Sequence, residues 1–170
     1  MIKKILIANR GEIAIRIAKT CKKKGIKTVG IYSEQDKESL HLNYCDYIFS
    51  LGNDPLKGSY LNIDKIIDIA HKTKADAVHP GYGFLSENYE FAKKLEKKKI
   101  LFIGPPHKAI KAMGDKIESK KIAKNAGVNC IPGINKEIKN TKEAIKLSSK
   151  IGFPIMIKAS AGGGGKGMRI

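Results

Sequence analysis

Short apolar runs alternate with helical patterns through the first two thirds of the chain. Residues 4–8 form an apolar run of the kind that fills a strand buried on both faces of a sheet. Ile13, Ile17 and Cys21 then recur at the spacing of one helix face. Residues 28–32 are a second apolar run, and the whole unit has the length that a right-handed parallel crossover needs. The pattern predicts a β-α-β unit at the start of the chain.

Polar residues and glycines between these elements predict where the helices begin and end. Asn9 and Glu12 have the spacing of a capping box, in which Asn9 caps the first helix and Glu12 reaches back to the Asn9 amide. Gly25 is expected to end this helix. Ser86 is expected to cap a later helix that begins at Glu87.

The alternation of strands and helices continues as far as Ile103. Strands are predicted at residues 46–51, 75–79 and 100–103, and helices at residues 63–71 and 87–95. A chain that alternates in this way folds into a parallel sheet with helices on both faces. Residues 1–112 are therefore predicted to form a doubly wound α/β domain.

The pattern changes after Pro106. Helices are predicted at residues 107–113, 115–125 and 141–150, followed by a buried apolar strand at residues 153–159. Residues 168–170 resemble the opening of a return strand. We therefore expect residues 113–170 to form the beginning of a second domain, which is incomplete in this chain.

The composition excludes several classes of protein. With 170 residues, of which 42% are hydrophobic, the chain is long enough to bury a core and is not a disordered segment. No stretch approaches the roughly 20 apolar residues that span a bilayer, and the N-terminus lacks the apolar segment of a signal peptide. We therefore expect neither a membrane protein nor an exported one. The three cysteines stand far apart without a C-x-x-C pair, which excludes a zinc knuckle and a disulfide framework and favours a reducing compartment.

The net charge of +17 raises the alternative of a nucleic-acid-binding protein. Among the 33 basic residues, however, the arginines are few (Arg10, Arg16 and Arg169), and arginine is the residue that base contacts and bidentate phosphate contacts favour. The lysines are spread over every predicted helix and are not interleaved with aromatic residues. We therefore expect solvated helix surfaces rather than a nucleic-acid site.

A glycine-rich segment near the C-terminus carries the clearest chemistry. It follows the last predicted strand and consists of Gly162, Gly163, Gly164, Gly165, Lys166 and Gly167. Such a loop lets several backbone amides approach one anion, and its lysine adds a mobile positive charge. A flexible linker is the alternative, but linkers are usually flanked by Ser, Pro or charged residues rather than by a buried strand. We expect a lid that folds over the phosphates of a nucleotide.

Two common nucleotide-binding motifs do not match this chain. In a Walker A loop, Ser or Thr would follow Lys166, where this chain has Gly167. A dinucleotide-binding fingerprint needs three glycines after the first strand, where the turn of this chain holds Gly11 alone. The doubly wound domain is therefore expected to be a scaffold rather than the nucleotide site.

Two lysines are candidate nucleotide ligands. Lys158 ends the predicted buried strand beside the glycine-rich loop, and a buried ammonium without an anion is costly. The alternative for Lys158 is to extend to the surface at the end of the strand. Lys116 is less distinctive, because lysine occurs throughout this chain.

The loop at residues 79–88 is a third candidate. It joins the end of a predicted parallel strand to a helix, which is where α/β sheets place ligands. Tyr82, Gly83 and Glu87 are its candidate active-site residues. The sequence offers no histidine pair at metal-ligand spacing, no paired carboxylate site and no nucleophile elbow.

Five segments of the chain resemble the biotin carboxylase family in their order and spacing. They are residues 7–14 (IANRGEIA), 79–88 (HPGYGFLSEN), 102–105 (FIGP), 113–116 (MGDK) and 157–169 (IKASAGGGGKGMR). The likeness covers essentially the whole chain. Within the family, residues 116–120 and 158–162 resemble most the α chains of propionyl-CoA carboxylases, and the acetyl-CoA, pyruvate and methylcrotonoyl-CoA carboxylases stay open as alternatives.

The resemblance implies a Rossmann-like N-terminal domain followed by the start of an ATP-grasp domain. It implies an enzyme that uses ATP, bicarbonate and Mg²⁺ (or Mn²⁺) to carboxylate biotin on a carrier protein through carboxyphosphate. By matching motif, Lys116 and Lys158 would bind ATP, with Gly164 and Gly165 in the lid over its phosphates. The magnesium carboxylates, the bicarbonate-binding arginine and the catalytic base of the family would lie beyond Ile170, so we expect no catalytic or metal-binding residue within this chain.

The resemblance also implies partners and a location. The partners would be a biotin carboxyl carrier domain and a carboxyltransferase component, the enzyme would be an oligomer, and no nucleic acid or membrane would take part. The compartment would be the cytoplasm of a bacterium or the mitochondrial matrix of a eukaryote. A short nucleotide-sensing or interaction module is the first alternative function, and a nucleic-acid binder is a less favoured one.

Overall fold

The computed structural model describes residues 1–54, 56–131, 133–134, 136–157 and 168–170. The chain divides into two compact units, Met1–Ile110 and Lys111–Ile170. Within the described residues, no helix is both long enough and apolar enough to cross a membrane.

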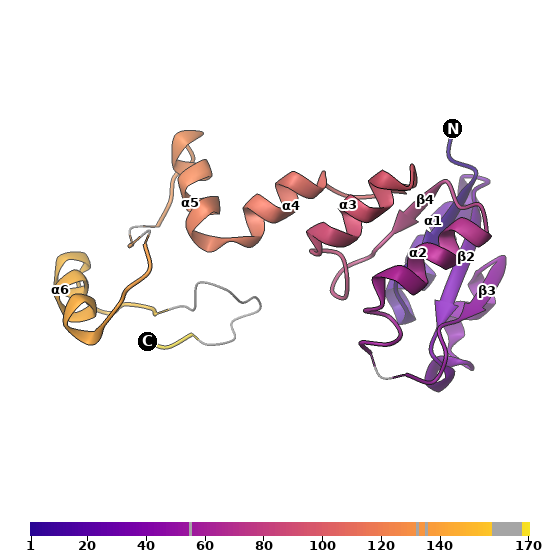
Figure 1. The fold of residues 1–170 in the computed structure, drawn as a ribbon, viewed down its shortest axis with the longest axis horizontal. Coiled ribbons are helices and arrows are strands. Elements are labelled where there is room, and N and C mark those ends of the chain that lie inside the picture. The colour runs from indigo at the N-terminus through magenta and orange to yellow at the C-terminus, as the bar shows by residue number, and fades with distance from the viewer. Residues whose placement is uncertain (55, 132, 135, 158–167) are drawn as a thin grey trace. The chain divides into compact units, whose positions relative to one another are not determined.

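The first unit is built on a five-stranded sheet (Figure 1). Its strands are β1 (Lys4–Ile7), β2 (Lys27–Tyr32), β3 (Tyr47–Ser50), β4 (Ala77–His79) and β5 (Leu101–Phe102). All neighbouring strands are parallel, in the order β3-β2-β1-β4-β5. The chain winds outwards from β1 in one direction and from β4 in the other, so the order reverses between β1 and β4. The predicted doubly wound α/β fold is confirmed.

Six helices accompany the sheet and continue beyond it within the described residues. They are α1 (Gly11–Lys23), α2 (Ile63–Lys72), α3 (Tyr89–Lys97), α4 (His107–Gly114), α5 (Lys116–Asn125) and α6 (Thr141–Ile151). Two short 3-10 turns, η1 (Glu34–Asp36) and η2 (Leu40–Tyr44), lie between β2 and β3. Each predicted helix is present, with ends that shift by one or two residues.

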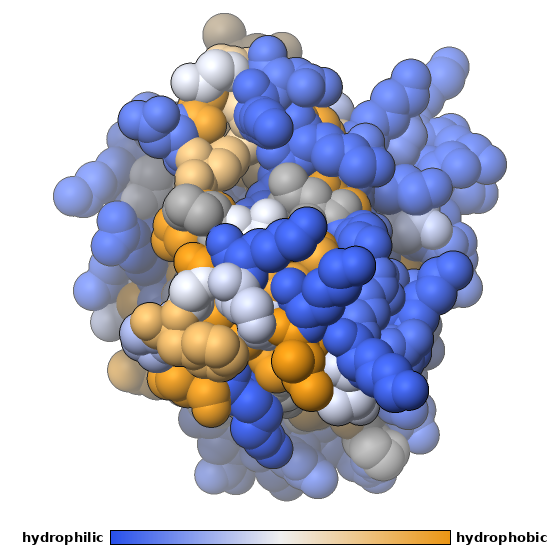
Figure 2. All heavy atoms as spheres, turned by 90° about the vertical axis from the view of Figure 1, so that its left-hand side faces the viewer, coloured by the Kyte–Doolittle hydropathy of each residue, from blue (hydrophilic) through white to orange (hydrophobic). Residues whose placement is uncertain are grey.

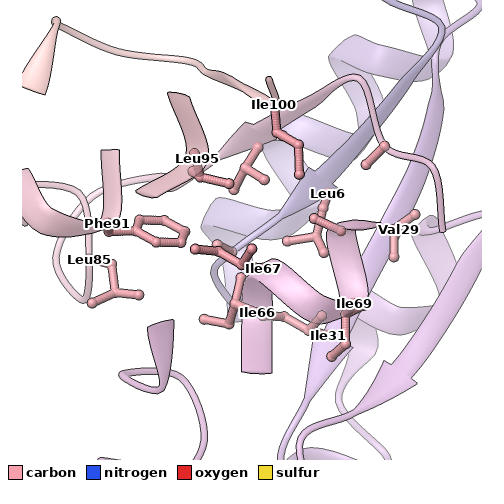
Figure 3. Packing of buried hydrophobic residues seen from close by; sticks show 14 of the residues in the cluster. Leu6, Val29, Ile31, Ile66, Ile67, Ile69, Leu85, Phe91, Leu95 and Ile100 are labelled. Atoms are coloured by element: carbon pink, nitrogen blue, oxygen red, sulfur yellow. The ribbon is translucent and has the colours of Figure 1, made fainter. Parts of the chain in front are cut away.

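The sheet buries a separate apolar cluster on each face. Successive side chains of a strand point to opposite faces, so Leu6 belongs to one cluster while Ile5 and Ile7 belong to the other. Residues of α2 and α3 complete the cluster around Leu6, where Figure 3 shows Ile66 and Phe91 gathered beside it, and α1 completes the second cluster. Each fully buried Val, Leu, Ile or Phe side chain stabilises the unit by about 1.5–3 kcal/mol.

Two helix caps differ from the predicted ones. The N-cap position of α1 is Arg10 and not Asn9, and no side chain caps this helix. The cap of α3 is Asn88, whose side-chain oxygen accepts a hydrogen bond from the Phe91 amide at 3.0 Å, and not Ser86. Turns occupy residues 84–87, and the Ser86 amide donates to the carbonyl of Gly83, so this helix begins two residues later than predicted.

The predicted buried strand at residues 153–159 is wrong in its burial. Among its described residues, Phe153 is 75% exposed and Ile157 is 56% exposed. Ile157 forms a single antiparallel bridge with Arg169, in which each amide donates to the other residue's carbonyl at 2.7 and 3.0 Å. The bridge agrees with a return strand at residues 168–170. A strand becomes buried only when neighbouring strands and a covering layer pack on it, and the described part of the second unit supplies neither.

Candidate functional site

Two loops meet where the strand order reverses. One follows β1 (the β1 loop, residues 8–10), and the other follows β4 (the β4 loop, residues 80–88). They border a cleft of about 410 Å³, the switch-point cleft, lined by Asn9, Arg10, Gly11, Glu12, Ile13, Asp36, Ser39, Tyr82, Gly83 and Phe84. Open α/β sheets bind their ligands at this position, at the carboxyl ends of the strands.

The side chain of Asn9 joins the two loops. Its Nδ2 donates hydrogen bonds to the carbonyl oxygens of Pro80 at 2.7 Å and Tyr82 at 2.8 Å. Its Oδ1 accepts a hydrogen bond from the amide of Arg10 at 3.0 Å. The capping role predicted for Asn9 is therefore wrong, because its amide group is used by a loop 71 residues away instead of by α1.

Glu12 also bonds to the β4 loop and not to the Asn9 amide. The phenol of Tyr82 donates to Oε1 of Glu12 at 3.2 Å, and this hydrogen bond raises the pKa of Tyr82 above its ordinary value. The Tyr82 side chain is otherwise open to solvent, with 67% of the residue exposed. A large exposed aromatic ring at the rim of a cleft is a group that can contact a ligand.

Arg10 is fixed on the other side of the cleft by a carboxylate and two rings. Its guanidinium lies 2.8 Å from Oδ2 of Asp36. It also lies over the rings of Tyr60 and Phe84, at 5.3 and 5.7 Å from their centroids. These two rings stack on each other at 5.1 Å with an interplanar angle of 6°. The cation–π contacts and the ion pair together hold Phe84, and with it the end of the cleft-lining segment.

Asp36 is the polar centre of this cluster. Its Oδ2 accepts hydrogen bonds from Arg10, from the Tyr60 hydroxyl at 2.7 Å and from the Ser33 hydroxyl at 3.2 Å. Partial burial raises the pKa of Asp36, but the hydrogen bonds from Arg10 and Tyr60 and the charge of Arg10 outweigh burial, so the pKa lies below 3.8. Burial and the hydrogen bond to Asp36 raise the pKa of Tyr60. Both groups therefore keep their charge states, ionised and neutral, through the physiological range.

We expect Asp36→Asn to destabilise the protein at neutral pH and to have progressively less effect in acid. The folded-state pKa of Asp36 is below its ordinary value of 3.8, so its ionisation stabilises the fold above that pH. This stabilisation is lost as the pH falls below about 4 and approaches the folded-state pKa. Urea unfolding of both proteins between about pH 3 and pH 7 measures the difference. A difference that stays constant over this range would show that the charge of Asp36 is not what stabilises the cluster.

The backbone of the β4 loop adopts conformations that most residues avoid. Gly81 and Gly83 have φ angles of +65° and +66°, and Phe84 has +39°. Phe84 pays a steric cost there that a glycine would not, and such residues persist only where surrounding contacts hold them. The Tyr60 stack and the Asn9 hydrogen bonds are those contacts.

The structure brings some of the predicted site residues together and separates others. Tyr82 and Gly83 line the switch-point cleft, whereas Glu87 is exposed outside it. Lys116 is the first residue of α5 in the second unit, where Asp115 caps the helix by accepting from two backbone amides. Seven further predicted residues lie outside the described residues: Lys158, Gly162, Gly163, Gly164, Gly165, Lys166 and Gly167.

Among the described residues, no group of three His, Cys, Asp or Glu side chains lies close enough together to hold a metal ion. The cluster of Arg10, Asp36 and Tyr60 is the part of the site that sequence reasoning missed. Its members are separated by 24 and 26 residues along the chain and share no motif, so no signal in the sequence points to their contact.

The chain is similar to known proteins over its whole length. Residues 1–110 match the family model of the biotin carboxylase N-terminal domain, and residues 115–170 match that of the ATP binding domain of the carbamoyl-phosphate synthase L chain. The chain is 60% identical over 167 residues to the mitochondrial propionyl-CoA carboxylase alpha chain of Mus musculus. This alignment covers 98% of the chain and 23% of the mouse protein, so the chain spans less than a quarter of that relative.

Solved structures also match nearly the whole chain. The biotin carboxylase of Campylobacter jejuni in complex with β-γ-ATP superposes with a TM-score of 0.95 at 48% identity, covering 99% of this chain and 38% of that one. The biotin carboxylase domain dimer of Hydrogenobacter thermophilus 2-oxoglutarate carboxylase, with MgADP, ADP and bicarbonate, gives 0.94 at 48% identity, covering 99% and 37%. These matches confirm the resemblance found in the sequence. With the N-terminal domain model matching residues 1–110 of 170, the chain belongs to the biotin carboxylase family.

Proposed function

We propose that residues 1–170 serve as the N-terminal part of an enzyme that carboxylates biotin on a carrier protein. ATP would phosphorylate bicarbonate to carboxyphosphate, and the CO₂ unit would then pass to a ureido nitrogen of biotin. One observation carries the proposal: 99% of the chain superposes at 48% identity on biotin carboxylases solved with nucleotides and, in one of them, bicarbonate.

Within this enzyme, the first unit is a scaffold and the second contributes to the ATP site. Lys116 and Lys158 would contact the nucleotide, and Gly162–Gly167 would close over its phosphates as a glycine-rich lid. Mg²⁺ or Mn²⁺ would accompany ATP on ligands outside the described residues. A Rossmann-like unit without a glycine fingerprint agrees with the scaffold role.

The proposed partners follow from the same relationship. Biotin would be presented by a carboxyl carrier domain, and a carboxyltransferase component would choose the final acceptor. The similar proteins include a propionyl-CoA carboxylase chain and a 2-oxoglutarate carboxylase domain, so the acceptor varies among them. The Hydrogenobacter domain forms a dimer, which supports an oligomer here as well. The compartment would be the bacterial cytoplasm or the mitochondrial matrix.

A chimera tests the proposed function. Residues 1–170 would replace the matching part of the Campylobacter jejuni biotin carboxylase, which is 48% identical. We expect ATP hydrolysis that depends on bicarbonate and is stimulated by free biotin. A folded chimera without bicarbonate-dependent hydrolysis would contradict the proposal.

In the same chimera, Lys158→Ala is expected to raise the KM for ATP. A charge-assisted hydrogen bond to a phosphate contributes about 1.5–3 kcal/mol, which corresponds to a rise of roughly 10- to 150-fold. Lys150→Ala is the matched control, because Lys150 is an exposed lysine in the last turn of α6. Equal KM values for the two variants would show that Lys158 does not contact ATP.

The alternative function, a short nucleotide-sensing module, predicts a different affinity for Mg-ATP. Such a module would bind Mg-ATP with the 170-residue chain alone. In a carboxylase, tight binding also needs the metal ligands, so we expect the isolated chain to bind Mg-ATP poorly. Isothermal titration calorimetry distinguishes the two, and micromolar affinity would favour the sensing module.

A further inference from the structure

The buried side chain of Asn9 has its hydrogen-bonding groups committed to the two loops of the switch-point cleft. Asn9 is 3% exposed, and its two donated hydrogen bonds go to the β4 loop. Its acceptor oxygen is bonded to the Arg10 amide in its own loop. Because an amide has one acceptor end and one donor end, this arrangement fixes the orientation of the side chain. Asn9 therefore does not cap α1, and its donor group is used by the β4 loop instead.

The β4 loop needs such an external constraint. Three of its four residues from Gly81 to Phe84 have positive φ angles. Gly81 also lies so close to Asn9 that an added Cβ would be 2.6 Å from Nδ2. The loop backbone therefore packs directly against Asn9. Tyr82 lies between Gly81, which Asn9 contacts, and Gly83, which precedes the Phe84 ring stacked on Tyr60.

Tyr82 is held by two hydrogen bonds, one at its backbone and one at its side chain. Asn9 donates to its backbone carbonyl, and Glu12, three residues further along in the first turn of α1, accepts from its phenol. The two contacts come from one short segment of chain, so a shift of the carbonyl would also move the ring away from Glu12. Tyr82 and Gly83 both line the switch-point cleft.

We propose that Asn9 is a positioning residue: its side-chain amide sets the conformation of residues 80–83 and thereby directs Tyr82 and Gly83 into the switch-point cleft. This role follows from the contacts between the two loops and does not depend on which reaction the protein catalyses. Its relevance to catalysis rests on the proposed function and is tested separately by kinetics.

The test compares the 170-residue chain carrying Asn9→Ala with the parent chain. Ile17→Val is the control substitution, because Ile17 lies in the apolar cluster that contains Ile5 and Ile7. The chain contains no tryptophan and six tyrosines, so ultraviolet titration measures phenol ionisation directly. The difference from a Tyr82→Phe chain isolates Tyr82. We expect its pKa to be raised in the parent and in Ile17→Val, and to return to the ordinary value of 10.0 in Asn9→Ala. Glu12→Gln should lower it in the same way without releasing the loop.

Hydrogen exchange provides the second measurement. We expect the amides of residues 81–84 to exchange at least about 10-fold faster in Asn9→Ala than in the parent, and Ile17→Val to leave their rates unchanged relative to the rest of the unit. If Asn9→Ala does not fold, Asn9→Asp takes its place, because it keeps the shape of the side chain but replaces the Nδ2 donor with an oxygen that accepts. A variant that melts earlier but retains the Tyr82 pKa and the loop exchange rates would overturn the positioning role.

Kinetics in the chimera connect the positioning role to the reaction. We expect Asn9→Ala to lower kcat by at least about 10-fold while the KM for ATP stays unchanged, because the proposed ATP ligands are in the second unit. Unchanged kcat would overturn the catalytic relevance of the loop. An inactive parent chimera would contradict the proposed function alone, since the titration and exchange experiments do not depend on activity.

Discussion

Gly81→Ala is expected to lower the free energy of unfolding of the first unit by about 3 kcal/mol. Two costs combine at this position. The φ angle of +65° is unfavourable for any residue with a Cβ, and the new Cβ would lie 2.6 Å from Nδ2 of Asn9 and 2.8 Å from Cγ2 of Ile13. Asn9 cannot easily retreat, because it is buried and hydrogen-bonded. In a domain of this size the change corresponds to roughly 15 °C in Tm, which circular dichroism measures.

Gly83→Ala provides a matched control two residues away. Its φ angle is +66°, but no atom lies within 4 Å of the position that its Cβ would take. The backbone cost alone remains, so we expect a loss of about 1 kcal/mol and a fall in Tm of roughly 5 °C. Equal effects of the two substitutions would show that the close approach of Asn9 does not constrain Gly81.

The fold of the first unit was predictable because periodicity and burial agree there. β1 is apolar at every position that the sheet buries, and the helix pattern of Ile17 and Cys21 places both residues in the core. Parallel strands covered on both faces require such apolar runs. The local sequence pattern and the overall fold therefore predict the same buried residues. The chain segment around Phe153 has an equally apolar pattern but lacks covering layers in the described structure, and the predicted burial was therefore wrong.

The candidate site was predictable in part only. Its expected location follows from the general rule for α/β sheets, and Tyr82 and Gly83, predicted from their place in a strand-to-helix loop, line the cleft there. The role of Asn9 was misjudged because capping is judged from the next three or four residues, whereas its actual partners lie 71 and 73 residues away. An amide that can satisfy either a helix end or a distant loop takes whichever partner the fold places beside it.

Limited trypsin digestion is expected to remove the second unit and leave a fragment that ends close to Lys111. No described residue after Ile110 is buried, and Val128, Ile131 and Phe153 are all more than half exposed. Figure 2, which views the chain from the side of α6, shows such apolar residues at the surface among hydrophilic ones. A segment that buries so little opens at almost no cost, whereas the helices and strands of the first unit open only with global unfolding.

The expected difference in cleavage rate is large and is not caused by the distribution of cleavage sites, since lysines occur throughout both units. If the first unit is stable by about 5 kcal/mol, its helices and strands should be cut at least about 1,000-fold more slowly than the second unit, and mass spectrometry of timed samples identifies the fragments. Phe91→Ala is the control, because emptying the space of this fully buried ring costs about 3–5 kcal/mol and should abolish the protection. Simultaneous cleavage of both units in the parent chain would mean that the apolar cluster around Leu6 and Phe91 does not stabilise the first unit independently. The same outcome would remove the basis for treating that unit as a scaffold, because a scaffold must hold the β1 and β4 loops in place whatever the second unit does.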